Sequence, residues 1–133
     1  MSSVRTSRRA KSVCGWIGIT CWLLIIPAKT VRHFDLALHP LVTGLAPSFL
    51  GPCGLLLVVL SGERPFAGVT LARGILIAGS LALLLEFVQA LPLVRRFYTF
   101  DWLDVAVTLI GLAAGAFLGG ALRCGAGREA GAG

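Results

Sequence analysis

Long apolar runs separated by short polar segments dominate this chain. Four runs are nearly free of charge, and each is far longer than the five or six residues of an ordinary strand. None shows the sustained alternation of apolar and polar residues that a half-buried strand requires. Crossing about 30 Å of hydrocarbon takes about 20 helical residues. The pattern therefore predicts four transmembrane helices, over residues 13–28, 36–60, 74–92 and 102–122.

The connections between these runs are short, which predicts antiparallel neighbours in an up-down bundle. The fold class expected is all-α, an integral membrane bundle of four transmembrane helices. The bundle occupies residues 13–122, a basic cytoplasmic segment precedes it at 1–12, and a disordered cytoplasmic tail follows at 123–133. The composition agrees, since 56% of the 133 residues are hydrophobic, 14% are charged and the mean hydropathy is +0.88.

Three prolines interrupt the second run: Pro40, Pro47 and Pro52. Proline has no backbone N–H, so it leaves a carbonyl of the preceding turn without its helical donor. In a membrane such prolines are tolerated where neighbouring helices or polar side chains bind the freed carbonyls. The prolines are therefore compatible with a transmembrane helix inside a bundle.

Lysine and arginine in short loops set the orientation of membrane proteins, with the excess in the cytoplasm. Eight lie before the first helix, between the second and third, or after the fourth: Arg5, Arg8, Arg9, Lys11, Arg64, Arg73, Arg123 and Arg128. Four lie on the other side: Lys29, Arg32, Arg95 and Arg96. This bias predicts that both termini are cytoplasmic.

The basic N-terminus favours anionic lipid as a partner. A basic segment followed by an apolar run also resembles a secretory signal, but no convincing small-x-small cleavage site follows, so a retained anchor is favoured over a cleaved signal. The net charge of +6 does not predict nucleic-acid binding, because the basic residues are split among loops and ends without a soluble aromatic-bearing module.

The four cysteines do not predict a metal site, because Cys14, Cys21, Cys53 and Cys124 form no C-x-x-C pair and have no neighbouring histidine cluster. They are expected as small buried apolar residues. The chain also lacks a phosphate-binding glycine loop, a G-x-S-x-G elbow and an H-E-x-x-H helix. We expect no metal and no cofactor, and the sequence identifies no catalytic residue.

Charged and polar residues gather where the third and fourth predicted helices reach the outer face. Glu86 lies six residues before the proline that ends the third helix, about 9 Å along the axis. An ionised carboxylate facing lipid there costs several kcal/mol, so Glu86 is predicted to face the bundle, with Gln89 on the same side. The alternative is that Glu86 pairs with Arg95 or Arg96 only to fix helix packing.

Polar residues and glycines of the fourth helix recur at steps of three and four on one face: Asp104, Thr108, Gly111, Gly115 and Gly119. The three glycines permit close backbone approach and indicate helix packing, either within one chain or between copies in a homo-oligomer. We call the face formed by Gly111, Gly115 and Gly119 the glycine seam. If the glycine seam packs against a neighbouring helix, Asp104 is carried inward, where Glu86, Gln89 and an arginine could reach it.

Asp35 and His39 approach the same face from the first outer loop. They are four residues apart and can adjoin on one helical turn, where the acid would orient the imidazole. Such a pair is more often an interfacial polar contact than a catalytic dyad.

The order of these residues resembles the VanZ-like family of small bacterial membrane proteins. The matching positions are Asp35, His39, Glu86, Gln89, Arg95 or Arg96, Asp104, Gly111 and Gly115. The chain departs from the family pattern at Leu36, where the family usually has lysine, and at Thr108, where it usually has asparagine. The resemblance implies a bacterial integral membrane protein and a link to resistance to glycopeptides such as teicoplanin, but it supplies no reaction.

We therefore expect a VanZ-like protein of the bacterial cytoplasmic (inner) membrane whose outer-face residues bind an anionic cell-envelope or lipid-linked group. The candidate ligand-binding residues are Asp35, His39, Glu86, Gln89, Arg95, Arg96, Asp104 and Thr108. The arginines would hold phosphate or carboxylate, and the acids and His39 would position them. Two alternatives remain: a membrane-embedded enzyme in which His39 or Glu86 is a general base acting on a lipid-linked substrate, and a non-catalytic assembly subunit.

Overall fold

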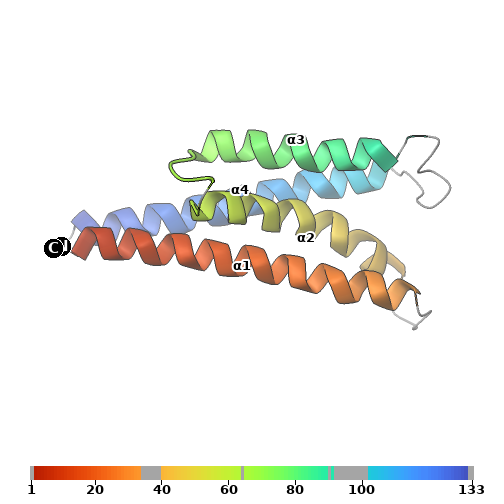
Figure 1. Cartoon of the computed structure of the whole chain (residues 1–133), viewed down its shortest axis with the longest axis horizontal. Helices are drawn as coiled ribbons and strands as arrows, with labels where there is room; N and C mark the ends of the chain where they lie inside the picture. The colour runs from red at the N-terminus through yellow and green to blue at the C-terminus, as the bar shows by residue number, and fades with distance from the viewer. Residues whose placement is uncertain (1, 34–39, 64, 90, 92–101, 132–133) are drawn as a thin grey trace.

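Four helices make up the computed structural model of the chain (Figure 1). The structure describes residues 2–33, 40–63, 65–89, 91 and 102–131, with side chains over 9–27, 45–63, 65–88, 91 and 102–122. The helices are α1 (Ser2–His33), α2 (Pro40–Ser61), α3 (Leu71–Gln89) and α4 (Trp102–Gly131). The described residues contain no strand. The predicted all-α class with four helices is confirmed.

The ends of α1 and α4 differ from the predicted bounds. α1 begins at Ser2 rather than at residue 13 and continues through Pro27 to His33, while α4 continues to Gly131 instead of ending at residue 122. Most of the segment predicted as a disordered tail is therefore helical. Hydropathy marks the stretch that fits hydrocarbon, whereas a helix continues until a residue breaks it, and neither 2–12 nor 123–131 contains proline.

The ends of α2 and α3 follow from local chemistry. Pro40 opens α2, where its missing N–H has no helical partner to lose. α2 ends at Ser61, and Gly62 directly after it adopts the left-handed φ of +70° that glycine tolerates best. Thr70 caps α3, since its side-chain oxygen accepts a hydrogen bond from the Arg73 N–H at 3.4 Å. The short connection makes α2 and α3 antiparallel neighbours.

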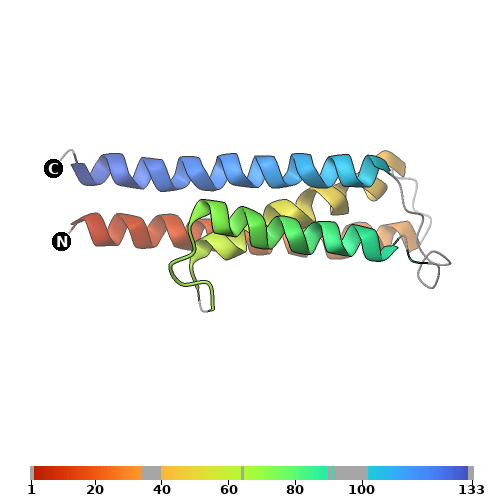
Figure 2. The same ribbon diagram turned by 90° about the horizontal axis from the view of Figure 1, so that it is seen from above.

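α2 and α4 lie side by side in the middle of the bundle, with α1 and α3 flanking them (Figure 1). Each of the two central helices contacts the other three, whereas no contact joins α1 and α3 in the described part of the chain. Both termini lie at the same end of the bundle (Figure 2), where α1 and α4 project beyond the turn between α2 and α3.

The buried core follows α2. Leu56, Leu57, Val59 and Leu60 are fully buried. The other three helices expose large apolar side chains, including Trp16 on α1, Leu76 on α3 and Phe117 on α4. A soluble monomer rarely leaves so much apolar surface exposed, and this distribution is that of a membrane protein.

Three helices are long and apolar enough to cross a membrane, over Arg9–Pro27, Leu71–Val88 and Trp102–Leu122. α2 contributes a shorter apolar stretch, Leu45–Ser61, among the residues described. Figure 1 shows that α2 is bent in its first half, where Pro47 and Pro52 interrupt the helical hydrogen bonds.

The glycine seam of α4 packs against α2 within the same chain. A Cβ atom added to Gly111 would collide with the backbone of Phe49, and one added to Gly115 would lie 3.1 Å from the carbonyl oxygen of Cys53. A Cβ on Gly119 would meet the side chain of Leu60. The predicted close approach is confirmed, and the partner that the sequence left open is α2.

Candidate functional site

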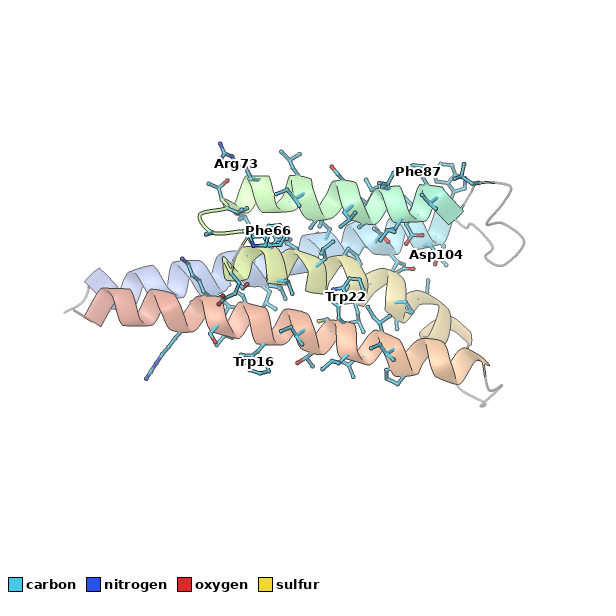
Figure 3. The ribbon with its side chains drawn as sticks, in the orientation of Figure 1. Trp16, Trp22, Phe66, Arg73, Phe87 and Asp104 are labelled. Atoms are coloured by element: carbon cyan, nitrogen blue, oxygen red, sulfur yellow. The ribbon has the colours of Figure 1, made fainter. Side chains whose placement is uncertain are left out.

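Four residues from three helices form a polar cluster near the end of the bundle opposite the termini: Ser48 on α2, Glu86 on α3, and Asp104 and Thr108 on α4. Figure 3 shows Asp104 and Phe87 toward this end, while Arg73 lies at the other end of α3. The cluster lies where α3 ends and α4 begins, so two helices that are antiparallel neighbours deliver their polar residues to one place.

Thr108 is the centre of the cluster. Its side chain is 2% exposed, and its Oγ1 lies 3.1 Å from Oε1 of Glu86 and 3.2 Å from the carbonyl oxygen of Ser48. Both separations are hydrogen-bonding distances. One hydroxyl on α4 therefore links α3 to α2.

The Ser48 carbonyl is available to Thr108 because of Pro52. In an α-helix the carbonyl of residue 48 accepts a hydrogen bond from the N–H of residue 52, and proline has none. Thr108 approaches this oxygen from α4. A polar side chain of a neighbouring helix thus binds the carbonyl that the proline leaves free, as expected for a proline inside a membrane helix.

Glu86 faces the bundle, as predicted. It is 8% exposed although it lies only three residues before the end of α3. The neighbouring Leu85 and Phe87 are exposed on the apolar outer surface. The carboxyl group is therefore inside the protein and close to one end of it.

Asp104 is half-buried and accepts a hydrogen bond from the Ser48 hydroxyl, with 3.5 Å between Ser48 Oγ and Asp104 Oδ1. Asp104 thus meets α2, while the predicted contact of Asp104 with Gln89 and an arginine stays a prediction. The α4 residue that contacts Glu86 through a hydroxyl is Thr108, one turn further along. Ser48 of α2 thus makes two hydrogen bonds to α4: its carbonyl oxygen accepts from Thr108 and its hydroxyl donates to Asp104.

Ser48 was not predicted as a member of the cluster. Its signal in the sequence is its position, since it lies between two prolines and four residues before the second of them. A carbonyl freed in this way needs a donor from another helix, which marks the place on α2 where a polar neighbour is required.

The structure does not describe the side chains of five predicted ligand-binding positions. Asp35, His39, Arg95 and Arg96 lie outside the described residues, and α3 ends at Gln89, whose side chain is not described. Their candidate roles remain predictions. Between α3 and α4 the two arginines are nevertheless close in sequence to Glu86 and Asp104.

The cluster offers two carboxyl groups, two hydroxyl groups and a backbone carbonyl, all of which accept hydrogen bonds. It suits a proton, an ammonium or guanidinium group, or the hydroxyls of a ligand. The described residues contain no group of three or more histidine, cysteine, aspartate or glutamate side chains that could hold a metal ion.

No protein-family model, curated protein or solved structure matches this chain. The resemblance to the VanZ-like family rests on the residues quoted from the sequence.

Proposed function

We propose that this chain is a VanZ-like protein of the bacterial cytoplasmic membrane, with four spanning helices and both termini in the cytoplasm. In this proposal the polar cluster lies near the outer face and orients Arg95 and Arg96, which bind the polar head of an anionic cell-envelope or lipid-linked group. The protein acts by binding, and glycopeptide susceptibility of the teicoplanin type changes as a consequence.

The hydrogen bond between Thr108 and Glu86 carries the proposal. A carboxyl group that is 8% exposed inside an apolar helix bundle costs free energy, and such groups are functional candidates by default. Three residues separate Glu86 from the end of α3, which is about 4.5 Å along the helix axis. The cluster is therefore close to the end of α3, where a headgroup at the membrane surface approaches it.

The topology is supported by the positions of the helix ends. An even number of crossings places both termini at one end of the bundle, which supports α2 as a fourth span beside the three longer apolar helices. Arg9, Lys11 and Arg73 lie toward the end that carries the termini. The positive-inside rule then assigns this end to the cytoplasm and the polar cluster to the outer side.

In this proposal the basic residues bind the ligand and the acidic residues hold the basic residues in place. Arg95 and Arg96 supply planar guanidinium groups that bind phosphate or carboxylate with two parallel hydrogen bonds. Glu86 and Asp104 orient these arginines by accepting their remaining N–H groups. An apolar ligand tail lies in the bilayer along the exposed leucines of α3, such as Leu84.

The test is retention of lipid by the purified protein. The wild-type protein is exchanged in detergent against phosphatidylglycerol, a polyprenyl phosphate and neutral phosphatidylcholine, and native mass spectrometry measures what stays bound. We expect retention of an anionic lipid that falls at least about tenfold in Glu86→Gln, because losing a charged contact of this kind costs roughly 2 kcal/mol or more. Arg96→Lys should weaken retention as well, since an ammonium group cannot form the two parallel bonds.

Ser80→Ala is the matched control, because Ser80 is exposed on α3 away from the cluster. It should retain lipid like the wild type. Equal retention by well-folded Glu86→Gln and wild-type protein would refute the proposed function.

A further inference from the structure

The outward side of α1 carries an arginine and an indole near the end of the bundle that holds the termini. Arg9 and Trp16 are seven residues apart, which is close to two helical turns, so both lie on one face of the helix. Both side chains are exposed, Trp16 to 70%. Figure 3 shows Trp16 on the side of α1 that faces away from α2. The two side chains therefore share one outward surface of the bundle.

The opposite face of α1 fixes this orientation, because it packs closely against α2. Cys14 on that face is buried, and a Cβ atom added to Gly18 would lie 2.7 Å from the carbonyl oxygen of Gly54. α1 cannot rotate about its axis without separating from α2 at this crossing. The face with Arg9 and Trp16 is therefore held toward the lipid.

Lys11 shows the height of this surface relative to the membrane. A Cβ atom added to Gly62, directly after α2, would lie 3.8 Å from Cδ, Cε and Nζ of Lys11. The Lys11 side chain therefore lies at the level where the apolar stretch of α2 ends. Arg9 is two residues further out, about 3 Å along the axis, and Trp16 is five residues deeper, about 7.5 Å. This places the cations at the headgroup layer and the indole just below it, where aromatic residues gather in membrane proteins.

The first turns of α1 contain positive charge without any negative charge. Residues 2–33 include no aspartate or glutamate, and residues 2–11 include four basic residues: Arg5, Arg8, Arg9 and Lys11. Arg5 and Arg9 are four residues apart, and Arg8 and Lys11 are three apart, which are the spacings at which like charges on a helix repel each other. An anion outside α1 would offset this repulsion.

We propose that the outward face of α1 at Arg9 and Trp16 binds an anionic phospholipid of the leaflet at this end of the bundle. Charge complementarity selects the lipid, since segments 1–12, 62–73 and 123–133 together hold eight basic residues and two acidic ones. The planar guanidinium of Arg9 binds the phosphodiester, and an acyl chain lies beside Trp16 and the exposed Val13. This site is at the opposite end of the bundle from the polar cluster and goes beyond the proposed function.

Quenching of Trp16 fluorescence by brominated lipid measures which lipid lies beside this face. The probe is the full chain with Trp22→Phe and Trp102→Phe, so that Trp16 is the only tryptophan. The bilayers contain equal amounts of phosphatidylcholine and phosphatidylglycerol, with bromine on the chains of one lipid or the other. At about 0.1 M salt we expect stronger quenching by brominated phosphatidylglycerol, and at about 1 M salt, where the Debye length is about 3 Å, a smaller difference. Equal quenching by the two lipids at the lower salt concentration would overturn the inference.

Arg9→Gln tests the site itself, and Arg73→Gln is its matched control. Each removes one exposed positive charge near the same end of the bundle, but Arg73 is on α3, which makes no contact with α1 in the described part of the chain. One basic residue near an anionic surface changes lipid affinity about fivefold, so Arg9→Gln should lower the preference for phosphatidylglycerol by about that factor. Arg73→Gln should leave the preference at Trp16 unchanged. An equal fall in both variants would indicate the general positive charge instead of a local site and would overturn the inference.

Glu86→Gln separates this inference from the proposed function. Glu86 belongs to the polar cluster at the other end of the bundle, so this variant should keep the lipid preference at Trp16. The retention measurement for the polar cluster is repeated in Arg9→Gln protein, so that lipid bound at α1 does not contribute to it. A preference at Trp16 without lipid retention at the polar cluster supports this site and refutes the proposed function. Loss of the preference at Trp16 in Glu86→Gln would overturn the site on α1.

Discussion

Substitution of Gly111 by alanine tests whether the α2–α4 contact holds the bundle together. The added Cβ would lie within 3.0 Å of the Phe49 carbonyl oxygen and at 3.0 Å from its carbonyl carbon. Ordinary contacts begin at 3.4 Å, and the colliding atoms belong to the backbone, which cannot rotate away. The two helices must therefore move apart by several tenths of an ångström or more.

The magnitude follows from three contributions. Overpacking costs about 1–3 kcal/mol. Separation of α2 and α4 also stretches the 3.2 Å hydrogen bond from Thr108 to Ser48, one turn from Gly111, which contributes roughly 1 kcal/mol. Alanine gains about 0.5–1 kcal/mol over glycine within a helix. The expected net loss of stability is about 1–3.5 kcal/mol.

Gly120→Ala is the matched control on the same helix. Its Cβ would meet only the side chain of Leu71, at an ordinary 3.9 Å, so this variant should gain about 0.5–1 kcal/mol from helix propensity. Reversible unfolding in mixed detergent micelles, followed by circular dichroism, measures both variants. A Gly111→Ala protein as stable as Gly120→Ala would refute the packing argument.

Two further predictions concern topology and the α1–α2 contact. In a background without native cysteines, Ala67→Cys in the α2–α3 turn and Leu91→Cys beyond α3 should react with membrane-impermeant maleimide from opposite sides, with Leu91→Cys labelled from outside; labelling of both from one side contradicts four crossings. Gly54→Ala places a Cβ at 2.8 Å from the Cys21 Cβ and should cost about 1–3 kcal/mol of stability, whereas Gly51→Ala, with only Ile25 at 3.8 Å, should gain about 0.5–1 kcal/mol like Gly120→Ala; equal unfolding midpoints would contradict the close crossing of α1 and α2.

Hydropathy predicted four helices in their correct order because lipid-facing and buried helices are both apolar, and only the polar turns interrupt them. The inward orientation of Glu86 followed from the cost of a carboxylate in lipid. The ends of α1 and α4 could not be predicted from hydropathy, since both helices continue beyond the apolar stretch that the membrane requires. Hydropathy has no signal for a helix that leaves the membrane.

The pairing of helices could not be obtained from the pattern of one helix. The glycines of α4 predicted a close partner, but nothing in their spacing distinguishes α2 from a second copy of the chain. Ser48 was missed for a related reason. Its backbone oxygen, rather than its side chain, is the group that Thr108 contacts, and a backbone oxygen is present at every residue.

The α2–α4 contact imposes an order on assembly in the membrane. Helices leave the ribosome from the N-terminus onward, so α2 enters the bilayer before α4 has been synthesised. The crossing with α1 at Gly18 and Gly54 can form at once, because both helices are present early. The Ser48 carbonyl, in contrast, stays without Thr108 until the last helix arrives. A chain stopped after α3 would leave this carbonyl and the Glu86 carboxyl group without Thr108, so an unfinished bundle carries two polar groups in the bilayer that α4 covers in the finished one.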